Sequence, residues 1–250
     1  MIQLKLLSPE RVRRIRRSRR HPRWTQFDYL HLRLLNSDLE NALRDIDPPP
    51  HDVLDVYCGT RPYDDFLPSN ARLIGLDVEG NPYGVADVVS DEFLPFADDS
   101  FDLVTCIQAF QYVRDPTQAI GEMRRVLRPG GMLVLTVTHV WEYDRTVLEH
   151  RFTGPQLGYL LRAWEDVEVT ENGGRVVTWV TVTTSLLLTI QNRLPSTRGI
   201  TRLARVPFAA VYLALNGLGV TLDELERRSA RGPLTLPTNL LVTARKPRSA

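Results

Sequence analysis

A short apolar run that passes directly into a glycine turn constrains the fold of this chain more than any other feature. Residues 53–63 read V-L-D-V-Y-C-G-T-R-P-Y. The run is typical of a buried strand, and Asp55 stands near its end. Gly59 then allows the backbone to turn tightly and to lie close to a ligand. A strand that opens into such a turn favours the ligand-binding edge of an α/β sheet.

A second carboxylate follows at the end of the next strand-like run. Asp77 lies 18 residues after Gly59 and closes the run L-I-G-L-D. In a parallel sheet, ligands bind where the carboxyl ends of neighbouring strands meet. A carboxylate in that position can accept hydrogen bonds from both hydroxyls of a ribose. The two runs together therefore predict a site for a nucleoside.

Strand-like and helix-like segments alternate along most of the chain. Strands are expected at 52–56, 73–77, 86–89, 101–107, 132–137, 166–170 and 239–244, and the last two are expected to pair. Helices are expected at 27–43, 117–127 and 155–163. Such alternation predicts a parallel sheet with helices on both faces.

Charge is distributed unevenly, although the formal net charge is only +1. Residues 1–24 hold nine basic side chains and one acidic one, whereas the remainder holds 22 basic and 29 acidic side chains. Ser8 and Pro9 are typical of a helix start, so a short Arg-rich helix is expected there. It is either a solvated arm or a contact for anionic lipid or nucleic acid. The acidic balance of the body disfavours nucleic acid as a partner.

Four motifs in order carry a resemblance to a known family. After residues 53–63 and Asp77 come L-P-F-A-D-D-S-F-D-L-V at 94–104, I-G-E-M-R-R-V-L-R-P-G-G-M-L-V at 120–134 and R-F-T-G-P-Q-L at 151–157. Together they resemble class I S-adenosylmethionine (SAM) dependent methyltransferases, in particular the type 11 subgroup. The resemblance implies a Rossmann-like, seven-stranded, mostly parallel sheet with helices on both faces. It also implies SAM as the cofactor.

The resemblance assigns four groups of cofactor-binding residues. They are Asp55, Val56, Tyr57, Cys58, Gly59 and Thr60 for the methionine end, Asp77 and Val78 for the ribose and adenine, Asp91 and Glu92 for the adenine amino group, and Cys106, Ile107 and Gln108 for the floor near the sulfonium. The five histidines are scattered without ligand spacing, so no metal is expected.

Two departures from the family pattern leave a second interpretation open. Tyr57 stands where the family usually has Gly, and Gln111-Tyr112 stands where the subgroup often has Glu-His. A degenerate protein of this fold could bind a ligand without transferring a methyl group. A nucleic-acid methyltransferase that uses the Arg-rich segment is a third interpretation.

Methyl transfer depends mainly on alignment of acceptor, methyl and sulfur, and a base is needed only for a weak nucleophile. Candidates after the strand at 132–137 are His139, Tyr143 and His150. His139 comes directly after that strand, and its ordinary pKa suits a base. The alternative for His139 is an exposed loop residue.

Two uncharged runs, 176–192 and 206–222, each span 17 residues. Both are shorter than the ~20 residues of a membrane-spanning helix, and we expect a helical lid or cap near the C-terminus. The stretch 176–184 contains enough β-branched residues to form a strand instead. The expected domains are a basic arm (1–24), a SAM-binding core (25–175), the lid (176–236) and a closing strand with a tail (237–250).

The apolar lid favours a small acceptor that is hydrophobic or lipid-linked, methylated most simply at oxygen. The same helices could make a peripheral membrane contact or a homodimer. The two cysteines, Cys58 and Cys106, occupy motif positions and do not form a disulfide framework, and no signal peptide is visible. These features predict a cytoplasmic protein, with membrane association through the lid as the alternative.

Overall fold

Seven strands form one sheet in this computed structural model, which describes residues 6–91, 93–193, 200–229 and 235–248. The order across the sheet is β3-β2-β1-β4-β5-β7-β6. β7 runs antiparallel to both of its neighbours, and the other pairs are parallel. The bounds are β1 (Asp52–Val56), β2 (Arg72–Asp77), β3 (Val88–Val89), β4 (Phe101–Ile107), β5 (Leu127–Thr138), β6 (Glu165–Asn172) and β7 (Asn239–Arg245). The expected Rossmann-like, mostly parallel sheet is confirmed.

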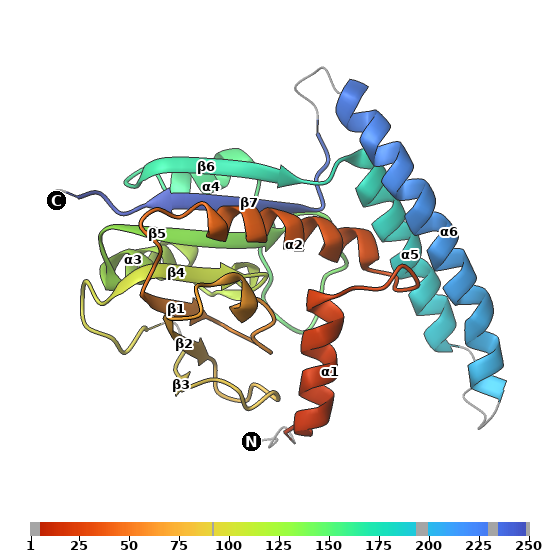
Figure 1. Cartoon of the computed structure of the whole chain (residues 1–250), viewed down its shortest axis with the longest axis horizontal. Helices are drawn as coiled ribbons and strands as arrows, with labels where there is room; N and C mark the ends of the chain where they lie inside the picture. The colour runs from red at the N-terminus through yellow and green to blue at the C-terminus, as the bar shows by residue number, and fades with distance from the viewer. Residues whose placement is uncertain (1–5, 92, 194–199, 230–234, 249–250) are drawn as a thin grey trace.

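Helices cover both faces of the sheet (Figure 1). The leucines of α2 (Tyr29–Arg44) pack against Val53 and Leu103 on one face. On the other face, α3 (Pro116–Val126) and α4 (Gly154–Leu160) share a larger core with Leu54 and Val104. Successive side chains of a strand point to opposite faces of the sheet. Val53 and Leu103 therefore pack in the layer with α2, and the adjacent Leu54 and Val104 pack in the layer with α3 and α4.

The fifth strand begins earlier than expected. Residues 128–131 are part of β5, and α3 ends at Val126. Leu127 pairs with Phe101 of β4, and the backbone of Gly130 and Gly131 exchanges hydrogen bonds with Lys246. These pairings extend the ladder through a segment whose Pro and Gly residues predicted a loop.

The N-terminal helix α1 (Pro9–Arg20) packs against the body of the protein. The Ser8 hydroxyl caps it by accepting from the N–H of Arg11 at 3.3 Å. At its other end, the Asn36 side chain of α2 donates to the carbonyl oxygens of Arg19 and Arg20, at 3.0 Å each. Val12 is buried on the inner face. The sequence predicted either a solvated arm or a contact for anionic lipid or nucleic acid. It did not predict that this helix packs on the body of the protein.

Helices α5 (Arg175–Arg193) and α6 (Ile200–Ser229) lie side by side at one end of the molecule (Figure 1). Both uncharged runs are therefore helical, including the β-branched stretch 176–184. The two helices pack on α2 through a separate apolar cluster that includes Leu30, Leu34 and Val180. Judged by length and composition alone, the segment Val206–Ser229 of α6 is long and apolar enough to cross a membrane. Of its most apolar 18-residue stretch, 22% is buried in the protein.

Candidate functional site

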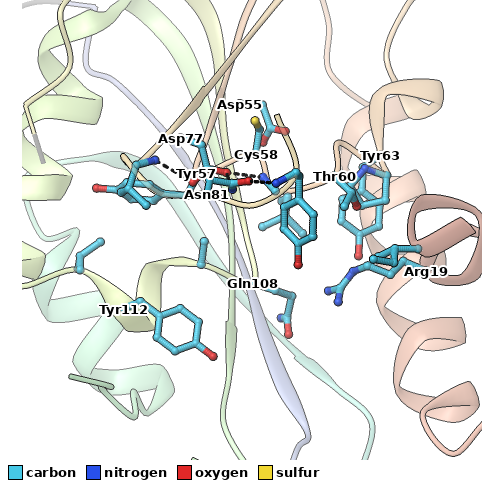
Figure 2. A pocket seen from close by; sticks show the side chains of 18 of the residues that line it. Arg19, Asp55, Tyr57, Cys58, Thr60, Tyr63, Asp77, Asn81, Gln108 and Tyr112 are labelled. Carbon is cyan, nitrogen blue, oxygen red and sulfur yellow. Dashed lines mark hydrogen bonds between the residues drawn. The ribbon is translucent and has the colours of Figure 1, made fainter. Parts of the chain in front are cut away.

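A pocket of about 700 Å³ opens where the sheet order reverses, beyond the carboxyl ends of β1 and β4 (Figure 2). This is the crevice in which open α/β sheets bind their ligands, and the volume is that of a small-molecule site. The loops after β1, β2 and β4 form its walls, and α1 closes one side.

The turn after β1 keeps a glycine-like backbone despite its bulky residues. Tyr57, Gly59 and Arg61 have φ values of 59°, 56° and 52°, all in the left-handed region. A side chain in that region costs roughly 1–2 kcal/mol, so Tyr57 and Arg61 are strained where Gly would not be. The Arg61 guanidinium is held by Asp64 at 3.2 Å and Asp87 at 2.7 Å. The turn thus has a backbone conformation that glycine adopts without strain.

The Tyr57 side chain lines the pocket beside Asp91. Its hydroxyl donates a long hydrogen bond of 3.5 Å to the carbonyl oxygen of Asp91. Tyr57 and Asp91 therefore join two loops on the same wall of the cavity. A ligand in this part of the pocket must share space with the phenol ring.

Asp77 is buried at the end of β2, with 5% of its surface exposed. Its carboxylate accepts from the N–H groups of Gly59 and Val78, both at 2.8 Å, and from the side-chain amide of Asn81. Figure 2 shows these bonds converging on Asp77 at the pocket wall. The carboxylate is thereby fixed in orientation while its residue lines the cavity.

Asp55, near the end of β1, also lines the pocket. Burial raises its pKa to about 7, although the Thr105 hydroxyl donates to it at 2.8 Å. The neighbouring Cys58 is buried, and burial together with Asp55 raises the pKa of its thiol well above the ordinary value. A thiol that stays protonated is a poor nucleophile, so Cys58 contributes shape.

Helix α1 supplies a cation to the pocket. Arg19 and Ile15 line the cavity, and Figure 2 shows the Arg19 side chain beside Tyr63, on the wall opposite Asp77. Among the described residues, no salt bridge of 4.0 Å or less involves Arg19; its polar and charged neighbours include Tyr63 and Asp28. An anionic group of a ligand would therefore meet an available positive charge.

A polar network supports the floor. Gln108 has a φ of 56°, and its side chain bonds to Thr136, Thr138 and Asn239 at 3.0–3.3 Å. Asn239 continues the network to the buried His31 at 3.1 Å, and burial lowers the pKa of that ring to about 3. His31 is thus neutral and structural, and the network fixes Gln108 at the end of β4.

Most of the residues expected to bind the cofactor line this one pocket. They are Asp55, Tyr57, Cys58, Gly59, Thr60, Asp77, Val78, Asp91, Ile107 and Gln108. Val56 and Cys106 instead pack in the core between the sheet and the helices. Glu92 lies outside the described residues.

The three expected bases do not line the pocket. Nδ1 of His139 is 2.8 Å from the carbonyl oxygen of Phe152. Tyr143 is exposed, and the His150 ring stacks on Phe152. All three follow β5 in the chain, and their catalytic role stays a prediction.

Other lining residues had no prediction from the sequence; they include Ile15, Arg19, Tyr63, Asn81, Tyr83, Tyr112 and Arg114. A signal existed for α1, because residues 12, 15 and 19 recur at helical spacing on one face. The remaining residues come from loops, whose placement depends on the folded sheet.

Comparison with known proteins gives one family match. Residues 54–135 match the family described as methyltransferase domain. A malonyl-[acyl-carrier protein] O-methyltransferase of Methylococcus capsulatus is 35% identical over 119 residues, which cover 42% of this chain and 43% of the relative. A demethylmenaquinone methyltransferase of Deinococcus radiodurans is 57% identical over 42 residues, 17% of each chain. The chain spans less than half the length of these curated relatives.

Solved structures share the fold at low sequence identity. The [4+2]-cyclase SpnF superposes with a TM-score of 0.54 at 23% identity, covering 85% of this chain and 82% of the cyclase. Phosphoethanolamine N-methyltransferase 2 of Haemonchus contortus gives a TM-score of 0.52 at 15% identity, covering 84% and 52%. At these identities the likeness establishes the architecture only.

Proposed function

We propose that this chain, whose residues 54–135 belong to the methyltransferase domain family, is a SAM-dependent methyltransferase. Its acceptor is a small molecule that is hydrophobic or lipid-linked, methylated most simply at oxygen. The observation that carries the proposal is the buried Asp77 carboxylate, held by Gly59 at the wall of a pocket of about 700 Å³.

The residues of the pocket fit the chemical groups of SAM. A ribose diol needs paired acceptors, which the Asp77 carboxylate supplies. The methionine end carries an ammonium and a carboxylate, for which Asp55 and Arg19 offer the opposite charges. Val78 offers an apolar contact for an adenine ring, and Asp91 lies on the same wall.

When bound, SAM supplies a methyl group on a sulfonium, which is already activated for displacement. The contribution of the protein is then to hold the acceptor in line and to exclude water. Gln108 is suited to a positioning role, because its left-handed backbone and its network fix it at the end of β4. His139, Tyr143 and His150 remain the candidates for removing a proton from an alcohol or phenol.

The lining favours an apolar acceptor. Ile15, Ala109, Tyr112 and Val113 form apolar wall around the ends of α1 and β4. Matching relatives are named for demethylmenaquinone and for an acyl carrier protein. These names support an acceptor with an apolar body, such as a phenol or quinol with an alkyl chain.

The test combines binding and turnover. Isothermal titration calorimetry should detect SAM binding, and release of S-adenosylhomocysteine should then be followed with a panel of alkylated phenols, quinols and fatty acids. NAD serves as the control ligand, because the chain lacks the G-x-G-x-x-G spacing of dinucleotide folds. Absence of SAM binding at millimolar concentration would overturn the proposal.

A second candidate function is ligand binding without methyl transfer. It is favoured by Tyr57, whose ring lines the pocket beside Asp91 where a glycine would leave space. The fold alone does not determine the reaction, as the structurally similar [4+2]-cyclase illustrates. SAM binding without release of S-adenosylhomocysteine, for every acceptor of the panel, would favour this function.

A further inference from the structure

Helix α5 presents an apolar stripe to the solvent. Trp179, Val182, Leu186 and Ile190 recur at helical spacing and are exposed, with Trp179 at 53% and Leu186 at 58%. The opposite side of α5 is buried on α2 and α6. The stripe therefore faces away from the body.

Helix α6 packs beside α5 and also exposes apolar side chains. Its exposed large apolar side chains are Val206, Val211, Leu213, Leu218 and Leu225. Nine of the twenty exposed large hydrophobic side chains in the described part of the chain thus belong to α5 and α6. A concentration of exposed apolar side chains on two adjacent helices is typical of an interaction site.

Basic residues border the apolar surface. Arg193 ends α5 and is exposed. Helix α1 adds Arg11, Arg13 and Arg17, all exposed. In Figure 1, α1 and the C-terminal end of α5 reach the same lower end of the molecule. An apolar face bordered by cations is typical of helices that lie in the interface of an anionic bilayer.

From this combination we infer that α5, α6 and α1 form a docking surface for an anionic lipid bilayer, called here the lipid-docking face. Its apolar side chains enter the acyl boundary, and its arginines contact phosphate head groups. Helix α1 also lines the pocket through Ile15 and Arg19. Docking therefore brings the pocket next to the membrane, where a lipid-linked acceptor resides.

A second copy of the chain fits this surface less well. The acidic groups at the far end of α6 are engaged locally: Asp223 pairs with Arg227 at 2.9 Å and Glu224 pairs with Arg228 at 2.9 Å. Glu226 accepts from the first N–H groups of α5 at 3.0–3.1 Å. These carboxylates already have partners within α5 and α6, whereas lipid phosphates supply matching charge for the arginines.

The test is flotation of the full chain with vesicles of phosphatidylcholine, with and without phosphatidylglycerol. We expect binding to the anionic vesicles and weak binding to the neutral ones. The Leu186→Glu/Leu218→Glu variant should lower the partition coefficient at least about tenfold, because two apolar contacts become charged. Arg13→Gln/Arg17→Gln should lower it about fivefold for each arginine on anionic vesicles only.

The matched control is Tyr159→Glu, which places a charge at an exposed aromatic residue of α4, a helix that packs on β6 and α3. It should bind vesicles like the wild type. Circular dichroism and SAM calorimetry establish that each variant folds, so loss of docking and loss of the proposed activity are separate readouts.

Equal binding of all variants would overturn the inference. So would a concentration-dependent dimer, seen by sedimentation velocity, that Leu186→Glu/Leu218→Glu abolishes.

Discussion

The N–H of Gly59 donates a hydrogen bond of 2.8 Å to Oδ2 of Asp77, which ties the turn after β1 to the end of β2. One carboxylate therefore shapes the pocket and lines it. In this arrangement, a substitution at Asp77 affects the loop and the ligand together. The two effects can be separated by comparing an isosteric replacement with a truncation.

Asp77→Asn retains an oxygen acceptor for Gly59 and loses the charge. We expect its SAM affinity to fall about tenfold, whereas Asp77→Ala should lose about a hundredfold because the turn is also released. Calorimetry with SAM measures both. Asp99→Ala, at an exposed site paired with Lys246, is the control. Wild-type affinity in Asp77→Ala would contradict the ribose assignment.

Arg19 is expected to bind the methionine carboxylate of SAM. Arg19→Met should weaken SAM binding by about 1.5–3 kcal/mol, the typical value of a hydrogen bond to a charged group. Binding of 5′-methylthioadenosine, which lacks the amino-acid tail, should change little. Calorimetry with both ligands measures the difference, and Arg17→Met on the exposed side of α1 is the control. Equal losses for the two ligands would assign Arg19 a structural role.

The sequence predicted the strands well where local signals are strong. β1 and β4 have the expected bounds. Each is a mostly apolar run that ends where polar or turn-forming residues begin. Asp55 and Asp77 were expected at one ligand-binding edge because strand ends of a parallel sheet converge, and both line the pocket. Arg19 was not, although it lies on the inner face of α1. Its place in the pocket follows from the contact of α1 with α2, which the helical spacing of residues 12, 15 and 19 does not specify.

Two family motifs turn out to bind each other. Arg125 of α3 donates to the carbonyl oxygens of Leu94 and Phe96 at 2.8 and 2.7 Å, and Glu122 accepts from the N–H of Leu94 at 3.0 Å. The L-P-F segment and the E-M-R-R segment thus form one clamp beside the sheet. Sequence resemblance identified both motifs, but only the structure assigns them this shared structural role.

The clamp can be tested through stability. Arg125→Met should lower the free energy of unfolding by about 2–3 kcal/mol, since it leaves two backbone carbonyls and Glu122 without their charged partner. Urea denaturation measures this change. Arg124 lies on the same helix and makes none of these clamp contacts. Arg124→Met should therefore change the free energy of unfolding by less than about 0.5 kcal/mol. Equal stability of the two variants would contradict the clamp.

Tyr57 offers a test of backbone strain. Its φ of 59° penalises any side chain, so Tyr57→Gly should be more stable than Tyr57→Ala by about 1 kcal/mol. This order is the reverse of that found in helices and strands. Thermal or urea unfolding of the two variants provides the measurement, with Gly and Ala at Gln118, an exposed position in α3, as the control pair. Greater stability of Tyr57→Ala would show that the turn is not strained.

The raised pKa of Asp55 predicts a pH dependence. Burial raises this pKa to about 7, so the carboxyl is largely protonated below that pH in the ligand-free protein. The cationic ammonium of SAM favours the ionised form, and binding below pH 7 must therefore release a proton. SAM affinity should fall about tenfold for each pH unit below 7 and level off above it.

The same shift acts on stability with the opposite sign. Because the folded pKa of Asp55 lies above its unfolded value of about 3.9, ionisation is more costly in the folded state. The free energy of unfolding of the ligand-free chain should fall as the pH rises from about 4 to about 7. In Asp55→Asn, this contribution should vanish, and SAM binding should lose its dependence on pH in the same range. Calorimetry in buffers of different ionisation enthalpy counts the proton released, and a wild-type pH profile in Asp55→Asn would assign the titration to another group.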